Sequence, residues 1–99
     1  MSQTIMRSRK NECYLCRKLY GNDNWCETEE HHIFDGPNRK LSEHYGLKVY
    51  LCDGHHQHSS EAVHVNAEML RKVQQDGQKA FEEAHPDLDF MAIFGRNYL

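Results

Sequence analysis

The sequence has no long apolar run, and this lack limits the classes of protein that it can encode. No stretch approaches the ~20 consecutive apolar residues that a membrane-spanning helix requires. The first ten residues, MSQTIMRSRK, also lack the apolar stretch of a signal peptide. We therefore expect a cytoplasmic protein with no membrane partner, in a compartment where cysteine thiols stay reduced.

Apolar residues are also few in total, so the fold cannot depend on a large hydrophobic core. They make up 38% of the 99 residues, against 27% charged residues. This length fits one domain, and a domain this small buries a smaller share of its surface than a larger one does. An aromatic content of 10% argues against a disordered chain. We expect a small fold that bound metal or partner chains help to stabilise.

Positive charge is not in excess either. The net charge is −3 with neutral histidines, which argues mildly against an obligate nucleic-acid binder. Bound divalent cations would offset this charge locally, so the sum alone does not exclude nucleic acid. Basic residues are concentrated near the start of the chain, and we predict that residues 1–11 form a flexible basic arm.

Strand and turn signals predict a hairpin within a core of residues 12–65. Residues 29–34 (EEHHIF) and 47–52 (LKVYLC) have strand character. Between them, DGPN at 35–38 indicates a turn. Residues 39–46 predict a short helix that ends at a glycine.

Two further helices are predicted in residues 66–99, packed on this core. Asn66 is a suitable N-cap for an amphipathic helix that ends at Pro86. Gly77 should weaken this helix by roughly 1 kcal/mol relative to alanine. Residues 87–95 predict a short apolar helix that stops at its final glycine.

The cysteines and one histidine have the spacing of a zinc site. Cys13 and Cys16 form a C-x2-C pair that we expect to bracket a tight turn, and Cys52 and His55 repeat the spacing. Structural zinc takes four thiolate or imidazole ligands, so the sequence predicts a site of these four residues. The alternative is a redox C-x2-C, which normally opens a helix in a βαβ context that is absent here. Cys26 fits no pair; we interpret it as a small core residue, with replacement of His55 as fourth ligand the alternative.

Asp53 is a candidate N-cap for a helix that follows the second predicted strand. This helix would carry His55 and His56, which lie ~100° apart around its axis and therefore face different ways. With His55 assigned to zinc, His56 is free for another role. The hairpin carries a second adjacent pair, His31 and His32, on its first strand.

The motifs CYLC, EEHHIF and LCDGHH together resemble those of the HNH endonucleases. The longer string HHIFDGPNRKLSEHYGLKVYLCDGHH resembles more particularly phage-encoded, recombination-associated HNH proteins, including nucleases that cut DNA at recombinase-coated sites. The resemblance covers residues 13–64, about half of the chain. It implies an α+β fold, namely a small zinc-stapled ββα-metal (HNH, or His-Me finger) fold with additional C-terminal helices.

The resemblance also implies a role for each histidine in these motifs. His31 would bind a catalytic divalent ion, His32 would be the general base that activates water, and His56 would be the helix-borne ligand of the ion. The family usually has a third ligand about one helical turn later, where this chain has a serine. His64 lies eight residues after His56, which is about 12 Å along an unbroken helix. It can therefore reach the ion only if the helix breaks near Ser59–Ser60.

Three polar residues at the end of the turn and the start of the following helix complete this expected site. Asn38 is the best substitute for the family's asparagine, which usually lies later in the chain and braces the loop of the catalytic histidine. Arg39 and Lys40 are either phosphate contacts or solvated charges, and the sequence leaves both readings open. Adjacent residues on a flat strand point to opposite faces, so His31 and His32 serve one phosphate only if the strand ends or bulges there.

The sequence thus predicts a metal-dependent HNH-type endonuclease that hydrolyses DNA in phage recombination or DNA processing. Its cofactors would be structural Zn²⁺ and a catalytic divalent ion, with Mg²⁺, Mn²⁺, Ni²⁺ and Zn²⁺ all open and histidine ligands favouring transition metals. DNA is the expected partner, and a recombinase filament is a further candidate. The rival prediction is a non-catalytic zinc module that binds nucleic acid or protein. A third is an assembly protein whose C-terminal helices mediate self-association.

Overall fold

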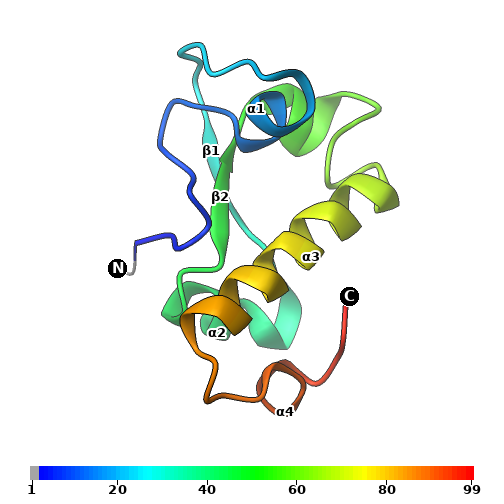
Figure 1. Cartoon of the computed structure of the whole chain (residues 1–99). Coiled ribbons are helices and arrows are strands. Elements are labelled where there is room, and N and C mark those ends of the chain that lie inside the picture. The colour runs from blue at the N-terminus through cyan, green and yellow to red at the C-terminus, as the bar shows by residue number, and fades with distance from the viewer. Residues whose placement is uncertain (1–2) are drawn as a thin grey trace.

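A two-stranded antiparallel hairpin lies at the centre of the computed structural model, which describes residues 3–99 (Figure 1). Strand β1 (Glu29–His32) pairs with β2 (Lys48–Leu51), with His31 opposite Val49. Both predicted strands are present, but each is shorter than the predicted segment, 29–34 for β1 and 47–52 for β2. The chain leaves the ladder after β1 because it must bend into the 3-10 turn Gly36–Asn38 and helix α2 (Arg39–His44) before it returns.

The predicted tight turn at the first cysteine pair is instead the start of helix α1 (Tyr14–Tyr20). Cys13 is its N-cap, and the Cys13 sulfur accepts a hydrogen bond from the Cys16 backbone N–H at 3.4 Å. Gly21, at φ 65°, ends the helix. The prediction of a turn was wrong here because a cysteine side chain can occupy the N-cap position and begin a helix itself.

The segment after β2 forms a π-helical turn, Gly54–His58, rather than an α-helix capped by Asp53. The Asp53 side chain makes no capping bond; its Oδ2 lies 2.6 Å from Nδ1 of His58. Asp53 therefore lies at the predicted N-cap position, but it does not cap the turn through its side chain. At Ser59 the backbone becomes extended (φ −112°, ψ 168°), so the helix breaks at the position that the histidine pattern requires.

The long helix α3 (Ala67–Ala84) begins where predicted, because the Asn66 side chain accepts hydrogen bonds from the N–H groups of Glu68 and Met69. Gly77, expected only to weaken the helix, has a packing role. A Cβ there would lie 3.1 Å from Cγ2 of Ile33, so its absence lets α3 approach the chain just after β1. The second predicted helix is α4 (Phe90–Phe94), which ends at a glycine with φ 79°.

The core joins the inner face of the hairpin to α1, α3 and α4. Aliphatic residues fill the part near the strands, and a group of rings fills the part near the C-terminus. The main members are Leu15, Leu47, Val49, Leu51, Val73, Phe34, Phe81, Phe90, Phe94 and Tyr98. These elements make a small α+β fold. Within residues 3–99, no helix has the length and apolar character needed to cross a bilayer.

The described part of the predicted flexible arm packs along β2. The Ile5 N–H donates to the Gly46 carbonyl at 2.9 Å, and the Tyr50 N–H donates to the Ser8 hydroxyl at 2.8 Å. The Met6 side chain is 5% exposed and belongs to the core. The basic composition of this segment gives no indication of these contacts. Residues 1–2 of the predicted arm lie outside the described part.

Substitution of Gly46 tests this packing. Gly46 has φ 70°, and a Cβ there would lie 2.3 Å from the Gln3 carbonyl oxygen. Gly46→Ala should lower the free energy of unfolding by about 2–4 kcal/mol, from backbone strain plus displacement of the N-terminal segment. Gly21→Ala is the matched control, since it has φ 65° and open space around a Cβ. Chemical denaturation should show a smaller loss of unfolding free energy for Gly21→Ala than for Gly46→Ala. Equal losses would show that the N-terminal segment does not pack against Gly46.

Candidate metal centres

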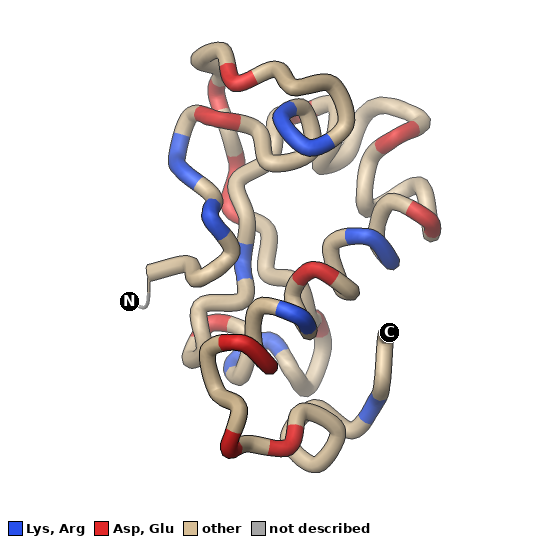
Figure 2. Tube along the Cα trace, viewed as in Figure 1, with Lys and Arg blue, Asp and Glu red and all other residues tan. Residues whose placement is uncertain are grey.

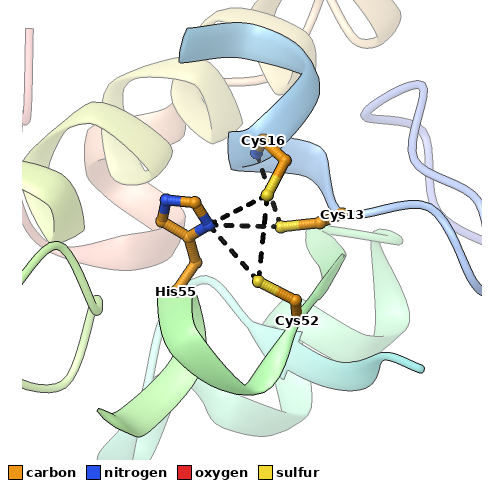
Figure 3. A group of neighbouring side chains, drawn as sticks. All are labelled: Cys13, Cys16, Cys52 and His55. Carbon is orange, nitrogen blue, oxygen red and sulfur yellow. Dashed lines mark hydrogen bonds between the residues drawn. The ribbon is translucent and has the colours of Figure 1, made fainter. Parts of the chain in front are cut away.

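Four side chains from two separate segments meet beside α1 (Figure 3). Cys13 and Cys16 come from the start of α1, Cys52 follows β2, and His55 lies in the π-helical turn. These are the four residues that the sequence predicts as a zinc site. Figure 3 shows the His55 ring with Nδ1 directed at the three sulfurs. We call this group the Cys3His cluster.

The distances within the Cys3His cluster fit one tetrahedral ion. A zinc ion with Zn–S of about 2.3 Å and Zn–N of about 2.0 Å places two sulfurs about 3.8 Å apart, and a sulfur and a nitrogen about 3.5 Å apart. The sulfurs of Cys16 and Cys52 are 3.9 Å apart. Nδ1 of His55 lies 3.5, 3.3 and 3.4 Å from the sulfurs of Cys13, Cys16 and Cys52. The donor set therefore could hold a structural metal such as zinc.

Neighbouring groups support the same interpretation of the cluster. Burial, then hydrogen bonding and charge from Cys13 and Cys52, raise the pKa of the Cys16 thiol. Metal binding would therefore displace protons from the cluster. The second ring nitrogen of His55, Nε2, is buried without a hydrogen-bond partner, and the Glu61 carboxylate lies 3.7 Å away. A carboxylate on the far side of a ligating imidazole is a common second contact in metal sites.

Cys26 lies apart from the Cys3His cluster. Its N–H donates to the Asn11 carbonyl at 3.0 Å, and its carbonyl accepts from the Asn11 side chain at 3.1 Å. The Cys26 side chain is partly buried and packs against the core. The structure thus places His55, not Cys26, beside the other three cysteines.

Three further histidines form a second group, the histidine triad: His31 from β1, His56 from the π-helical turn and His64 beyond it. The ring centroids are 5.5 Å apart for His31 and His56, 5.3 Å for His31 and His64, and 4.7 Å for His56 and His64. Nε2 of His56 and Nε2 of His64 are 3.1 Å apart, close to the roughly 3.3 Å between two nitrogens on one tetrahedral ion. His64 reaches this position because the helix breaks at Ser59.

His31 is the buried member of the triad, and the opposite side of the triad is open. Burial, then the charges of His56 and His64, lower the pKa of His31 to about 3, so its ring is neutral. Among the described residues 3–99, Nε2 of His31 is buried without a hydrogen-bond partner. The ring of His56 has Nδ1 3.0 Å from the Glu29 carboxylate. His31 is buried whereas His64 is exposed, so the triad opens to solvent at His64.

His32 does not face the triad. Its Nε2 lies 2.9 Å from the Glu43 carboxylate and 3.6 Å from that of Glu30. Lys48, opposite His32 in the ladder, binds the same two carboxylates. Side chains alternate along β1, so Glu29 and His31 lie on one face and Glu30 and His32 on the other. The expectation that both adjacent histidines approach His56 therefore holds for His31 alone, because the strand is regular at this point.

The remaining predicted site residues lie around the turn after β1. Asn38 donates from its side chain to the Phe94 carbonyl at 2.9 Å, so it attaches α4 rather than bracing a loop of the catalytic histidine. Arg39 and Lys40 line an open hollow of about 410 Å³ together with His32 and Glu43. Phosphate contact by these two cations thus stays a prediction, and the hollow is where it would occur.

Charged partners around both clusters were not foreseen from the sequence. Glu29, Glu43 and Glu61 each contact a predicted site residue, and Lys48 contacts Glu43. The signal for Glu29 was present, since it lies two positions before His31 and so shares its face of the strand. Glu43 and Glu61 reach their partners through folding of the connections, which no local pattern predicts.

Comparisons with known proteins give no relative. No family model matches the chain, and neither the curated proteins nor the solved structures contain a match.

Lys and Arg residues are spread over several elements rather than gathered in one stripe (Figure 2). Function must therefore be argued from the two clusters.

Zinc analysis of single variants tests the Cys3His cluster. Purified protein should contain one tightly held zinc per chain, and Cys16→Ser should lose it, because a structural site needs all four ligands. Cys26→Ser is the matched control and should keep the metal. Chelation should also lower the melting temperature of the wild type, since binding free energy at such a site is folding free energy. Zinc retained in Cys16→Ser would contradict the assignment.

Proposed function

We propose that the chain is a metal-dependent endonuclease of the HNH type that hydrolyses DNA phosphodiester bonds. The observation that carries this proposal is the histidine triad. It places three imidazoles from β1 and from the segment after β2 within ligand distance of one another. The Cys3His cluster includes His55, the residue before His56 in the same turn, and would act as a structural zinc site.

The composition of the triad suits catalysis better than structure. Structural zinc sites fill four positions with protein, whereas catalytic sites use three protein ligands and leave one position open. Imidazole ligands favour zinc, nickel or another transition metal over magnesium. A divalent ion bound there would supply positive charge to a phosphate oxygen and to the leaving oxygen. His31 and His56 would hold that ion, and His64 would complete the set on the solvent side.

Within this proposal His32 is the general base and Arg39 and Lys40 hold the DNA backbone. All three line one hollow, together with Glu43. A neutral imidazole can accept a proton from water at physiological pH. The contact with Glu43 orients the His32 ring in the hollow. To act on a phosphate at the triad, His32 would have to leave Glu43, and the end of β1 would have to change its backbone conformation, because the side chain starts from the opposite face of the strand.

One observation favours a second candidate, a non-catalytic zinc module that binds nucleic acid or protein. His32 is held by Glu43 on the face of β1 that is opposite the triad. A module of this kind needs the Cys3His cluster but has no use for an exchangeable second ion. The two candidates therefore differ in metal stoichiometry and in cleavage.

As further parts of the proposal, the chain acts in phage recombination or DNA processing in the host cytoplasm, with a recombinase filament as a candidate partner. These parts rest on the resemblance of residues 13–64 to HNH proteins. Cleavage of naked DNA compared with recombinase-coated DNA would test them.

The triad is tested by His64→Ala. Its second divalent ion should bind much more weakly than in the wild type or not at all, because one of three direct ligands is lost, and cleavage of plasmid DNA should fall with it. His58→Ala is the matched control, since His58 is exposed and contacts Asp53. Calorimetric titration and a plasmid assay over a series of divalent metals give both readouts. A wild type that holds one zinc and never cuts DNA would favour the zinc module.

The base is tested separately by His32→Ala. This variant should keep both ions and its fold but cut plasmid DNA roughly 100- to 10,000-fold more slowly, the usual contribution of a general base. Metal content and circular dichroism serve as controls for the fold. Cleavage at the wild-type rate would refute the role of His32 while leaving the metal site standing.

A further inference from the structure

Glu29, the first residue of β1, reaches the histidine triad with its carboxylate. Its Oε1 lies 3.0 Å from Nδ1 of His56. An ionised carboxylate can only accept hydrogen bonds, so Nδ1 of His56 carries the proton in this contact. Nε2, the other nitrogen of the neutral ring, then has the free lone pair.

That free lone pair lies on the side of the triad. Nε2 of His56 is 3.1 Å from Nε2 of His64, and the His31 ring packs edge-on against both rings. A metal ion binds the unprotonated nitrogen of a neutral imidazole. The contact with Glu29 therefore selects the tautomer of His56 that a metal ion in the triad needs.

A second polar group competes for the same nitrogen. The Gln57 side-chain amide nitrogen lies 3.4 Å from Nδ1 of His56, and donation from it would require the opposite tautomer. The carboxylate contact is 0.4 Å shorter (3.0 against 3.4 Å). It is also made by an ionised acceptor, which strengthens the hydrogen bond. The geometry thus favours Glu29 over Gln57 as the group that sets the tautomer.

We propose that Glu29 is a positioning residue that holds His56 in its metal-binding tautomer. The proposal rests on the proposed function in one respect, that the triad binds a divalent ion. Glu29 would orient the ring and raise its basicity, as carboxylates behind ligating histidines do. It would not touch the substrate.

The test is a titration of zinc-loaded protein with Ni²⁺ as the probe for the second site. Glu29→Ala should bind Ni²⁺ about 10- to 100-fold more weakly than the wild type. Glu29→Gln keeps a neutral acceptor and should lose less. Glu27→Ala, at an exposed glutamate two residues earlier, is the matched control and should bind Ni²⁺ as the wild type does.

A second readout is independent of bound Ni²⁺. Long-range ¹H–¹⁵N NMR of the protein before titration should show the Nδ1–H tautomer of His56 in the wild type and a mixture of tautomers in Glu29→Ala. If the wild type binds Ni²⁺ and Glu29→Ala binds it equally well with an unchanged tautomer, the positioning role is overturned and the metal site survives. If the wild type binds no second ion, the metal site itself is overturned together with this role.

Discussion

The meeting of three sulfurs and one imidazole at the start of α1 is the constraint on which the rest of the molecule depends. It brings the start of α1 together with the segment that follows β2. Tyr14 and Lys18 of α1 in turn contact Asp76 of α3, at 2.6 and 2.7 Å. These polar contacts thereby connect the hairpin, α1 and α3 in a protein that has few apolar residues.

Much of this architecture could be predicted from local sequence. Both strands, the cap at Asn66 and the stop at Gly95 follow from short-range preferences of backbone and side chain, which need no knowledge of the remaining chain. The two ligand pairs of the Cys3His cluster were also predictable, because metal chemistry fixes their spacing. The start of α1 at the cysteines was not, since it depends on a cysteine acting as N-cap.

Features that depend on tertiary contact could not be predicted. The N-terminal segment is basic in sequence, yet its backbone and one methionine are held against β2. The resemblance implies that His31 and His32 act on one phosphate, which needs β1 to end or bulge there, whereas the regular alternation of β1 turns His32 toward Glu43. The residues that decide this, Glu43 and Lys48, reach their positions only when the connection through α2 has folded.

On the face of the hairpin that carries His32, nearby carboxylates offset the cost of burying the Lys48 ammonium. Lys48 is 2% exposed, and burial alone would lower its pKa. Hydrogen bonds and charge from Glu43 and Glu30 outweigh this effect and raise the pKa of Lys48, so the ammonium stays charged. The two carboxylates are partly exposed, so the buried ammonium of Lys48 is the group that depends on them. His32 thus lies in a fixed charged environment.

His55 belongs to the Cys3His cluster and His56 to the histidine triad, so one peptide bond joins the two groups. The backbone carbonyls of both residues accept hydrogen bonds from Val63 and His64 on the returning chain, at 2.7 and 3.4 Å. Rotating this short segment to improve one set of ligands would spoil the other. The positions of the two ligand groups are therefore coupled. A metal ion that fixes His55 in the Cys3His cluster also restricts where His56 can lie in the histidine triad.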